Sequence, residues 1–179
     1  MNDEWNRLRP ILRPGEQIYW VGQPDPRVHF TPADALLVPF SLMWGGFALV
    51  WETQVIMKGA PIFFILWGVP FVLIGLYLIA GRFYFKRRRK LRTVYGVTNS
   101  RAIVSSSERS FAETPIKDAS MRMSRSRNGQ HVSVVFGTPR QTSYQNTGLD
   151  LFSLGQGQVV GFYDVSDADA LVSALDRAK

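Results

Sequence analysis

Two long runs of uncharged residues constrain this chain more than any other feature. Ala35–Trp51 and Ala60–Ala80 contain no acidic or basic residue, and Glu52–Gly59 separates them. A helix rises about 1.5 Å per residue and the hydrocarbon core of a bilayer is about 30 Å thick, so about 20 apolar residues cross it. The second run is long enough. The first needs either Ala33 and Asp34 at its boundary or some local thinning of the bilayer.

We therefore predict a transmembrane helical hairpin over residues 33–85, with spans at about 34–52 and 60–81. The alternative, two buried helices of a soluble protein, is disfavoured because the remaining polar-rich residues are too few to cover both runs on all sides. The hairpin divides the chain into an N-terminal segment, residues 1–32, and a C-terminal domain, residues 86–179.

A cluster of cations, here called the basic belt, directly follows the second run. The segment between the two runs contains a single cation, Lys58. Segments rich in Lys and Arg stay on the cytoplasmic side of a membrane. Because two spans return the chain to its starting side, we predict that both termini and the C-terminal domain are cytoplasmic. The seven members of the basic belt are Arg82, Lys86, Arg87, Arg88, Arg89, Lys90 and Arg92.

The net charge of +7 equals the number of cations in the basic belt, so the rest of the chain is close to neutral. This distribution argues against a general nucleic-acid-binding surface and favours local attraction to anionic lipid headgroups. Two interpretations of the belt remain: a determinant of topology alone, or a specific site for an anionic headgroup. A nucleic-acid role is disfavoured because the belt would lie at the membrane surface, without aromatic side chains facing away from it for base stacking.

Small residues recur within the predicted spans at helical spacing. Ser41 and Gly45 are four residues apart, and Gly68 and Gly75 are seven apart. Lipid offers no hydrophobic drive for helices to associate, and small residues let their backbones approach closely. We interpret these positions, and the one proline in each span, as packing features, because no charge within the spans marks a pathway.

Outside the spans, short β-branched and aromatic segments predict an α+β layout. Gln17–Gly22 is one such strand, and we expect it to join the sheet formed by the C-terminal half. A glycine-rich loop is predicted over Asn146–Gln158, and an amphipathic helix capped by Ser166 then covers an open edge of a small sheet or barrel. Further strands are predicted at Leu91–Thr98, Arg101–Ser107, Ser110–Thr114, Arg140–Gln145 and Val159–Asp164.

Asn128-Gly129 is a strong two-residue turn signal between the segments Ser120–Arg127 and Gln130–Gly137. With this pair as the turn, Met123 lies opposite Val134 on a mostly apolar inner face. Ser133 falls on the opposite, mainly polar face. The same register pairs Met121 with Phe136 and Arg125 with Val132.

Four segments resemble the pleckstrin-homology-like domains of small bacterial membrane proteins. They are Pro14–Pro24, Thr93–Val104 with its Tyr-x-x-Thr-Asn-x-Arg pattern, Gly129–Gly137, and Gly161 through the final helix. The resemblance implies a two-sheet, roughly seven-stranded β barrel or sandwich capped by a C-terminal helix, at the cytoplasmic face of the bacterial inner (plasma) membrane. It implies no catalytic residues.

The sequence contains no recognisable catalytic constellation. It has two histidines, His29 and His131, no cysteine, and no acidic or histidine group with metal-ligand spacing, so no metal or cofactor is predicted. Gly155–Gly161 departs from the dinucleotide-binding spacing. We predict a non-enzymatic, membrane-anchored interaction module that binds a protein partner or anionic lipid. We predict no nucleic-acid partner. The alternative is a small oligomeric transport or channel subunit built on the hairpin.

Overall fold

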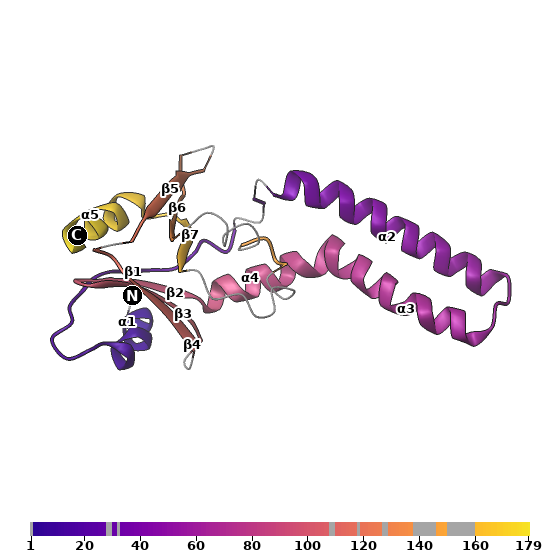
Figure 1. The fold of residues 1–179 in the computed structure, drawn as a ribbon, viewed down its shortest axis with the longest axis horizontal. Helices are drawn as coiled ribbons and strands as arrows, with labels where there is room; N and C mark the ends of the chain where they lie inside the picture. The colour runs from indigo at the N-terminus through magenta and orange to yellow at the C-terminus, as the bar shows by residue number, and fades with distance from the viewer. Residues whose placement is uncertain are drawn as a thin grey trace.

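The computed structural model describes residues 2–27, 30–31, 33–107, 110–117, 119–126, 129–137, 146–149 and 160–179. It consists of a domain with two antiparallel sheets and a long helical hairpin that extends away from it (Figure 1). Both ends of the chain lie in the domain, away from the tip of the hairpin. The predicted α+β class is confirmed at this level.

The hairpin is formed by α2 (Asp34–Met57) and by a second helix that begins with α3 (Ile62–Leu76). The second helix passes through a π-helical turn at Tyr77–Gly81 into α4 (Arg82–Arg92), so it is continuous over 31 residues. Both helices are long and apolar enough to cross a membrane. Both are also longer than the predicted spans.

Two predicted boundaries are corrected by these helices. Residues 53–57, expected between the spans, continue α2. The strand expected from Leu91 begins at Val94, because Leu91 and Arg92 complete α4. In both places a helix that was already formed gains one hydrogen bond for each residue added, which favours its continuation past the predicted boundary.

The small residues of the hairpin lie between its two helices, as predicted. Ser41 and Gly45 of α2 are buried, and so are Gly68 and Gly75 of α3. A Cβ atom built on Gly75 would lie 2.8 Å from the Cα atom of Gly45. The two backbones therefore meet at this pair of glycines, closer than any side chain permits.

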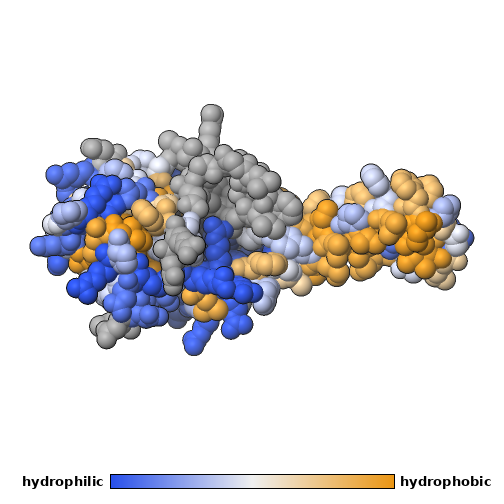
Figure 2. All heavy atoms as spheres, turned by 90° about the horizontal axis from the view of Figure 1, so that it is seen from below, coloured by the Kyte–Doolittle hydropathy of each residue, from blue (hydrophilic) through white to orange (hydrophobic). Residues whose placement is uncertain are grey.

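The outward faces of the hairpin carry large apolar side chains. Leu36, Phe47 and Ile62 are 75%, 70% and 68% exposed. Figure 2 shows the hairpin as an apolar projection from a largely hydrophilic domain. These exposures are opposite to those of core helices in a soluble protein, whose apolar side chains are covered.

The first sheet contains β1 (Ile18–Gly22), β2 (Val94–Thr98), β3 (Arg101–Ser107) and β4 (Ser110–Pro115), in that order. The N-terminal strand β1 pairs antiparallel with β2, with Gly22 opposite Tyr95, which confirms the predicted joining. All five residues of β2 are buried because both faces of this sheet are covered.

The second sheet contains β5 (Met121–Arg125), β6 (Val132–Phe136) and β7 (Gly161–Val165). The predicted register of β5 and β6 is confirmed, with Met123 opposite Val134. Val134 is fully buried but Met123 is 44% exposed, so the predicted inner face is realised on β6 and not on the edge strand β5. The strand predicted at Arg140–Gln145 lies outside the described residues, as do Asn128 and most of the loop predicted over Asn146–Gln158.

The main core lies between the two sheets and α5 (Ala168–Ala178). Phe162 of β7 stacks on Tyr95 of β2 with ring centroids 4.8 Å apart, and Leu171 of α5 packs in the same cluster. On the other face of the first sheet, Leu8 of α1 (Asn2–Leu8), which a 3-10 turn at Arg9–Ile11 follows, contacts a smaller cluster.

Two expectations for the domain are corrected. The expected two sheets are present, but the described strands form no closed barrel. Helix α5 follows Asp167, not Ser166, and has no side-chain capping hydrogen bond. The apolar face of α5 closes the space between the sheets, so burial of Leu171 and Leu175 holds this helix in place without a cap.

Candidate functional site: a cationic groove on helix α4

All seven cations of the basic belt lie on α4, and the helical period divides them between two faces. Arg82, Lys86 and Lys90 follow one another at intervals of four residues and are buried against the domain. Arg87, Arg88, Arg89 and Arg92 are exposed on the other face. The belt predicted as a single group is therefore two structurally different groups.

The buried Arg82 joins the two helices at the base of the hairpin. Its guanidinium pairs with the carboxylate of Asp34, the first residue of α2, and the two side chains are 1% and 4% exposed. Arg82 Nε also donates to the Leu78 carbonyl at 2.9 Å. Asp34 accepts a second hydrogen bond, from the Thr31 hydroxyl at 2.7 Å. A buried charge needs such partners, because desolvation without them costs several kcal/mol.

Lys90 anchors the other end of α4 to the second sheet. Its Nζ donates to Asp164 Oδ2 of β7 at 2.6 Å and to the Asp25 carbonyl at 3.1 Å. Asn146 Nδ2 donates to the same Asp164 oxygen at 2.8 Å. Lys86 is buried between Arg82 and Lys90 on the same face. The orientation of α4, and with it of the exposed arginines, is set by these buried contacts.

Three of the four exposed arginines border a groove of about 370 Å³ between α4 and the end of β3. None of its described lining residues is acidic. A guanidinium presents several N–H donors in a fixed plane and binds phosphate or carboxylate through two of them at once. We call this feature the cationic groove. It is lined by Phe85, Arg88, Arg89, Arg92 and Ser106.

The C-terminal end of α4 is held by side chains from neighbouring segments. The Thr93 hydroxyl donates to the Arg89 carbonyl at 2.9 Å, and the Arg7 guanidinium of α1 donates to the Arg92 carbonyl. These bonds satisfy carbonyls that have no partner within the helix. The backbone on which the groove arginines stand is thereby fixed at both ends.

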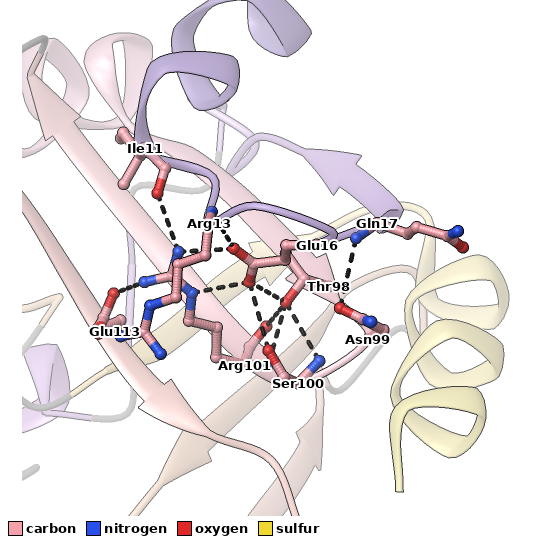
Figure 3. A network of polar contacts seen from close by, with 9 residues as sticks. All are labelled: Ile11, Arg13, Glu16, Gln17, Thr98, Asn99, Ser100, Arg101 and Glu113. Carbon is pink, nitrogen blue, oxygen red and sulfur yellow. Dashed lines mark hydrogen bonds and ion pairs between the residues drawn. The ribbon is translucent and has the colours of Figure 1, made fainter.

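A second polar cluster fastens the N-terminal segment to the turn between β2 and β3 (Figure 3). The Glu16 carboxylate accepts from Arg101 Nε at 2.8 Å, from Arg101 Nη2 at 2.7 Å and from the Thr98 hydroxyl at 2.7 Å. The bonds from Arg101 lower the pKa of Glu16 to about 2. Arg101 also pairs with Glu113 of β4.

This cluster gives a structural role to two of the motifs seen in the sequence. The Pro14–Pro24 segment contributes Glu16, and the Tyr-x-x-Thr-Asn-x-Arg pattern contributes Thr98 and Arg101. Tyr95, which begins that pattern, accepts a hydrogen bond from the Tyr163 N–H at 3.1 Å. The sequence marks both segments, but their side chains pair across 85 residues, which no local pattern reveals.

Of the two histidines in the sequence, only His131 lies in the described part of the chain. His131 Nε2 lies 2.9 Å from Asp25 Oδ2, and His29 lies outside the described residues. The backbone N–H of Arg27 is the main cause that lowers the pKa of Asp25. Within the same residues, no three His, Cys, Asp or Glu side chains are placed to hold a metal ion.

No family model, no curated protein and no solved structure matches this chain.

Proposed function

We propose that this chain is a membrane-anchored interaction module of a bacterial inner membrane, and that its cationic groove binds the phosphate of an anionic lipid headgroup. Its hairpin crosses the bilayer, both termini are cytoplasmic, and the domain has no enzymatic activity. The observation that carries this proposal is the direct continuation of an exposed apolar helix, α3, into an exposed row of arginines on α4.

Distances along the helix support this placement. Phe85 lies five residues past Ala80, about 7 Å beyond the apolar run, and Arg88 lies about 12 Å beyond it. The headgroup layer occupies roughly 5–8 Å on each side of the hydrocarbon core. Long side chains on a helix point back toward its N-terminus, which here is the direction of the membrane. The side chain of Arg88, the groove arginine nearest the membrane, therefore reaches headgroup phosphates.

The topology is supported by the hairpin itself. The turn at its tip carries Lys58, whereas α4 carries seven cations at the opposite end. Exposed Tyr84 and Phe85 stand at the base, where aromatic side chains favour the boundary between lipid and water. The positive end therefore belongs in the cytoplasm.

The pleckstrin-homology-like character of the domain remains part of the proposal. Its support is the pairing of two antiparallel sheets with a C-terminal helix that covers the space between them. The phosphate site argued above depends on α4 and β3 and does not require that assignment.

The test uses the full-length protein in detergent, titrated with dioctanoyl phosphatidylglycerol and followed by native mass spectrometry. The Arg88→Gln/Arg92→Gln variant removes two of the groove cations. At about 1 kcal/mol for each, affinity falls roughly 30-fold. The control Arg87→Gln/Arg125→Gln removes the same charge from exposed positions that do not line the groove.

We expect the control to bind like the wild type, and the wild-type affinity to fall steeply with salt. Equal weakening of both variants would show that overall charge, and not the groove, attracts the lipid. Binding that persists in the groove variant would place the headgroup elsewhere.

A further inference from the structure

A second cavity lies on the hairpin, toward its tip and away from the cationic groove. Its volume is about 190 Å³ and its walls are almost entirely aromatic. The cavity opens between the two helices, where Trp44 and Trp51 of α2 stand opposite Trp67 and Phe71 of α3. The lining residues are Trp44, Phe47, Ala48, Trp51, Trp67 and Phe71.

An acidic side chain lies beside the wall of this cavity, next to the lining residue Trp51, without being one of the lining residues itself. Glu52 follows Trp51 in α2, and its carboxylate lies over Gly68, where the Trp51 ring lies beside it. A Cβ atom on Gly68 would overlap both groups, so the absence of a side chain there makes room for the carboxylate. Glu52 Oε2 is buried and has no hydrogen-bond partner in the described part of the chain.

We propose that this cavity binds an alkylated ammonium group, with the aromatic rings as its walls and Glu52 as its counterion. The faces of aromatic rings carry negative potential and attract cations, and Trp does so most strongly. An acyl chain fills such a cavity but leaves the carboxylate without an opposite charge. An alkylated ammonium satisfies both features, because its carbon atoms contact the rings while its charge balances Glu52.

The position of Glu52 and Trp51 places the outer end of the cavity near the membrane surface in the proposed topology. Glu52 is 18 residues after Asp34, about 27 Å along the helix and thus near the outer boundary of a 30 Å hydrocarbon core. A choline headgroup of an outer-leaflet lipid and a free organic cation both present the required chemistry at that depth.

The test is an NMR titration of the full-length protein labelled with 15N-tryptophan, in nanodiscs of unlabelled scaffold and phosphatidylglycerol. The probes are choline and its neutral isostere 3,3-dimethylbutan-1-ol. The chain has five tryptophans, three of which line the cavity. Trp5 and Trp20, in the domain, are internal controls.

We expect choline to shift the indole signals of Trp44, Trp51 and Trp67 saturably, and the isostere to leave them unmoved. Glu52→Gln weakens choline binding about tenfold and Trp51→Leu removes it. Phe64→Leu, a hairpin aromatic outside the cavity lining, binds like the wild type. Nanodiscs of phosphatidylcholine separate the two sources: competition with added choline identifies the lipid headgroup, and its absence identifies a free cation.

Equal responses to choline and to the isostere would make this an apolar cavity and overturn the proposal. Unchanged affinity in Glu52→Gln, with the hairpin folded by circular dichroism, would overturn it as well. Neither result bears on the cationic groove, which lies at the other end of the hairpin.

Discussion

Arg82 of α4 and Asp34 of α2 form a buried ion pair where the two helices of the hairpin enter the domain. Arg82 is one of seven cations that the sequence presents as a single basic belt, yet it is 1% exposed and takes no part in any surface. Asp34 begins the first helix, so the pair joins the start of one helix to the extension of the other.

Removing one partner of this pair leaves a buried charge without compensation. We expect Arg82→Gln to lower the free energy of unfolding by about 3–5 kcal/mol. The double variant Arg82→Gln/Asp34→Asn recovers much of the loss, because no charge then remains unpaired. Thermal unfolding of the full-length protein in detergent measures both, and Arg87→Gln at an exposed position is the control. A double variant less stable than Arg82→Gln would contradict this account.

The contact between Gly45 and Gly75 predicts a sharp positional effect in the hairpin. Gly75→Ala places a methyl group against the Cα atom of Gly45, so the helices must separate and packing across the hairpin is lost. A Cβ atom on Gly46 meets nothing within 4 Å, so Gly46→Ala is the matched control. We expect a lower melting temperature for Gly75→Ala and an equal or higher one for Gly46→Ala. Equal losses would mean that the helices do not meet at Gly75.

The lowered pKa of Glu16 predicts that acid lowers the stability of the domain. Its pKa is about 2 when folded and 4.5 in the reference state, so its ion pair with Arg101 stabilises the fold fully above about pH 4.5. That stabilisation is lost as pH falls from about 4.5 toward 2, because the unfolded chain takes up the proton first. The contribution is on the order of 3 kcal/mol. Denaturant unfolding between pH 2 and 7 measures it. In Glu16→Gln the pH dependence is weaker over this range, and an unaltered profile would exclude Glu16 as its source.

Because β5 is an edge strand, we expect an aspartate substitution on β5 and one on its partner β6 to differ in their effect on stability. Val134→Asp buries an unpaired carboxylate and costs several kcal/mol. Ser124→Asp, on exposed β5, is nearly silent. Ser133 also lies on the mainly polar face, but it is not a suitable control, because its hydroxyl accepts a hydrogen bond from the Asp164 N–H at 3.1 Å. Thermal unfolding of both variants tests the arrangement, and comparable losses would argue against it.

The proposed topology is tested with single cysteines, since the chain has none of its own. A cysteine at position 58, on the exposed tip of the hairpin, is expected to react with a membrane-impermeant maleimide added to intact spheroplasts. A cysteine in place of Lys179 reacts only after lysis. The reverse pattern would invert the hairpin and move the cationic groove to the outside.

Features that depend on neighbours in the chain could be predicted from the sequence alone. The length and apolar character of the two runs predicted the hairpin. The spacing of Gly68 and Gly75 predicted which face of α3 packs, and the turn after β5 predicted the pairing of Met123 with Val134. Each of these follows from a helical or strand period, or from turn chemistry, acting over a few residues.

The tertiary structure alone decided how the basic belt is divided. Arg82 pairs with Asp34, 48 residues away, and Lys90 pairs with Asp164, 74 residues away, so no local pattern identifies either partner. The same holds for Glu16 and Arg101, and for the exposure of Met123, which depends on what covers the edge of a sheet. Whether a charged side chain on α4 is buried or remains exposed to a ligand depends on which other residues pack against it. Those contacts form only when the domain folds against α4.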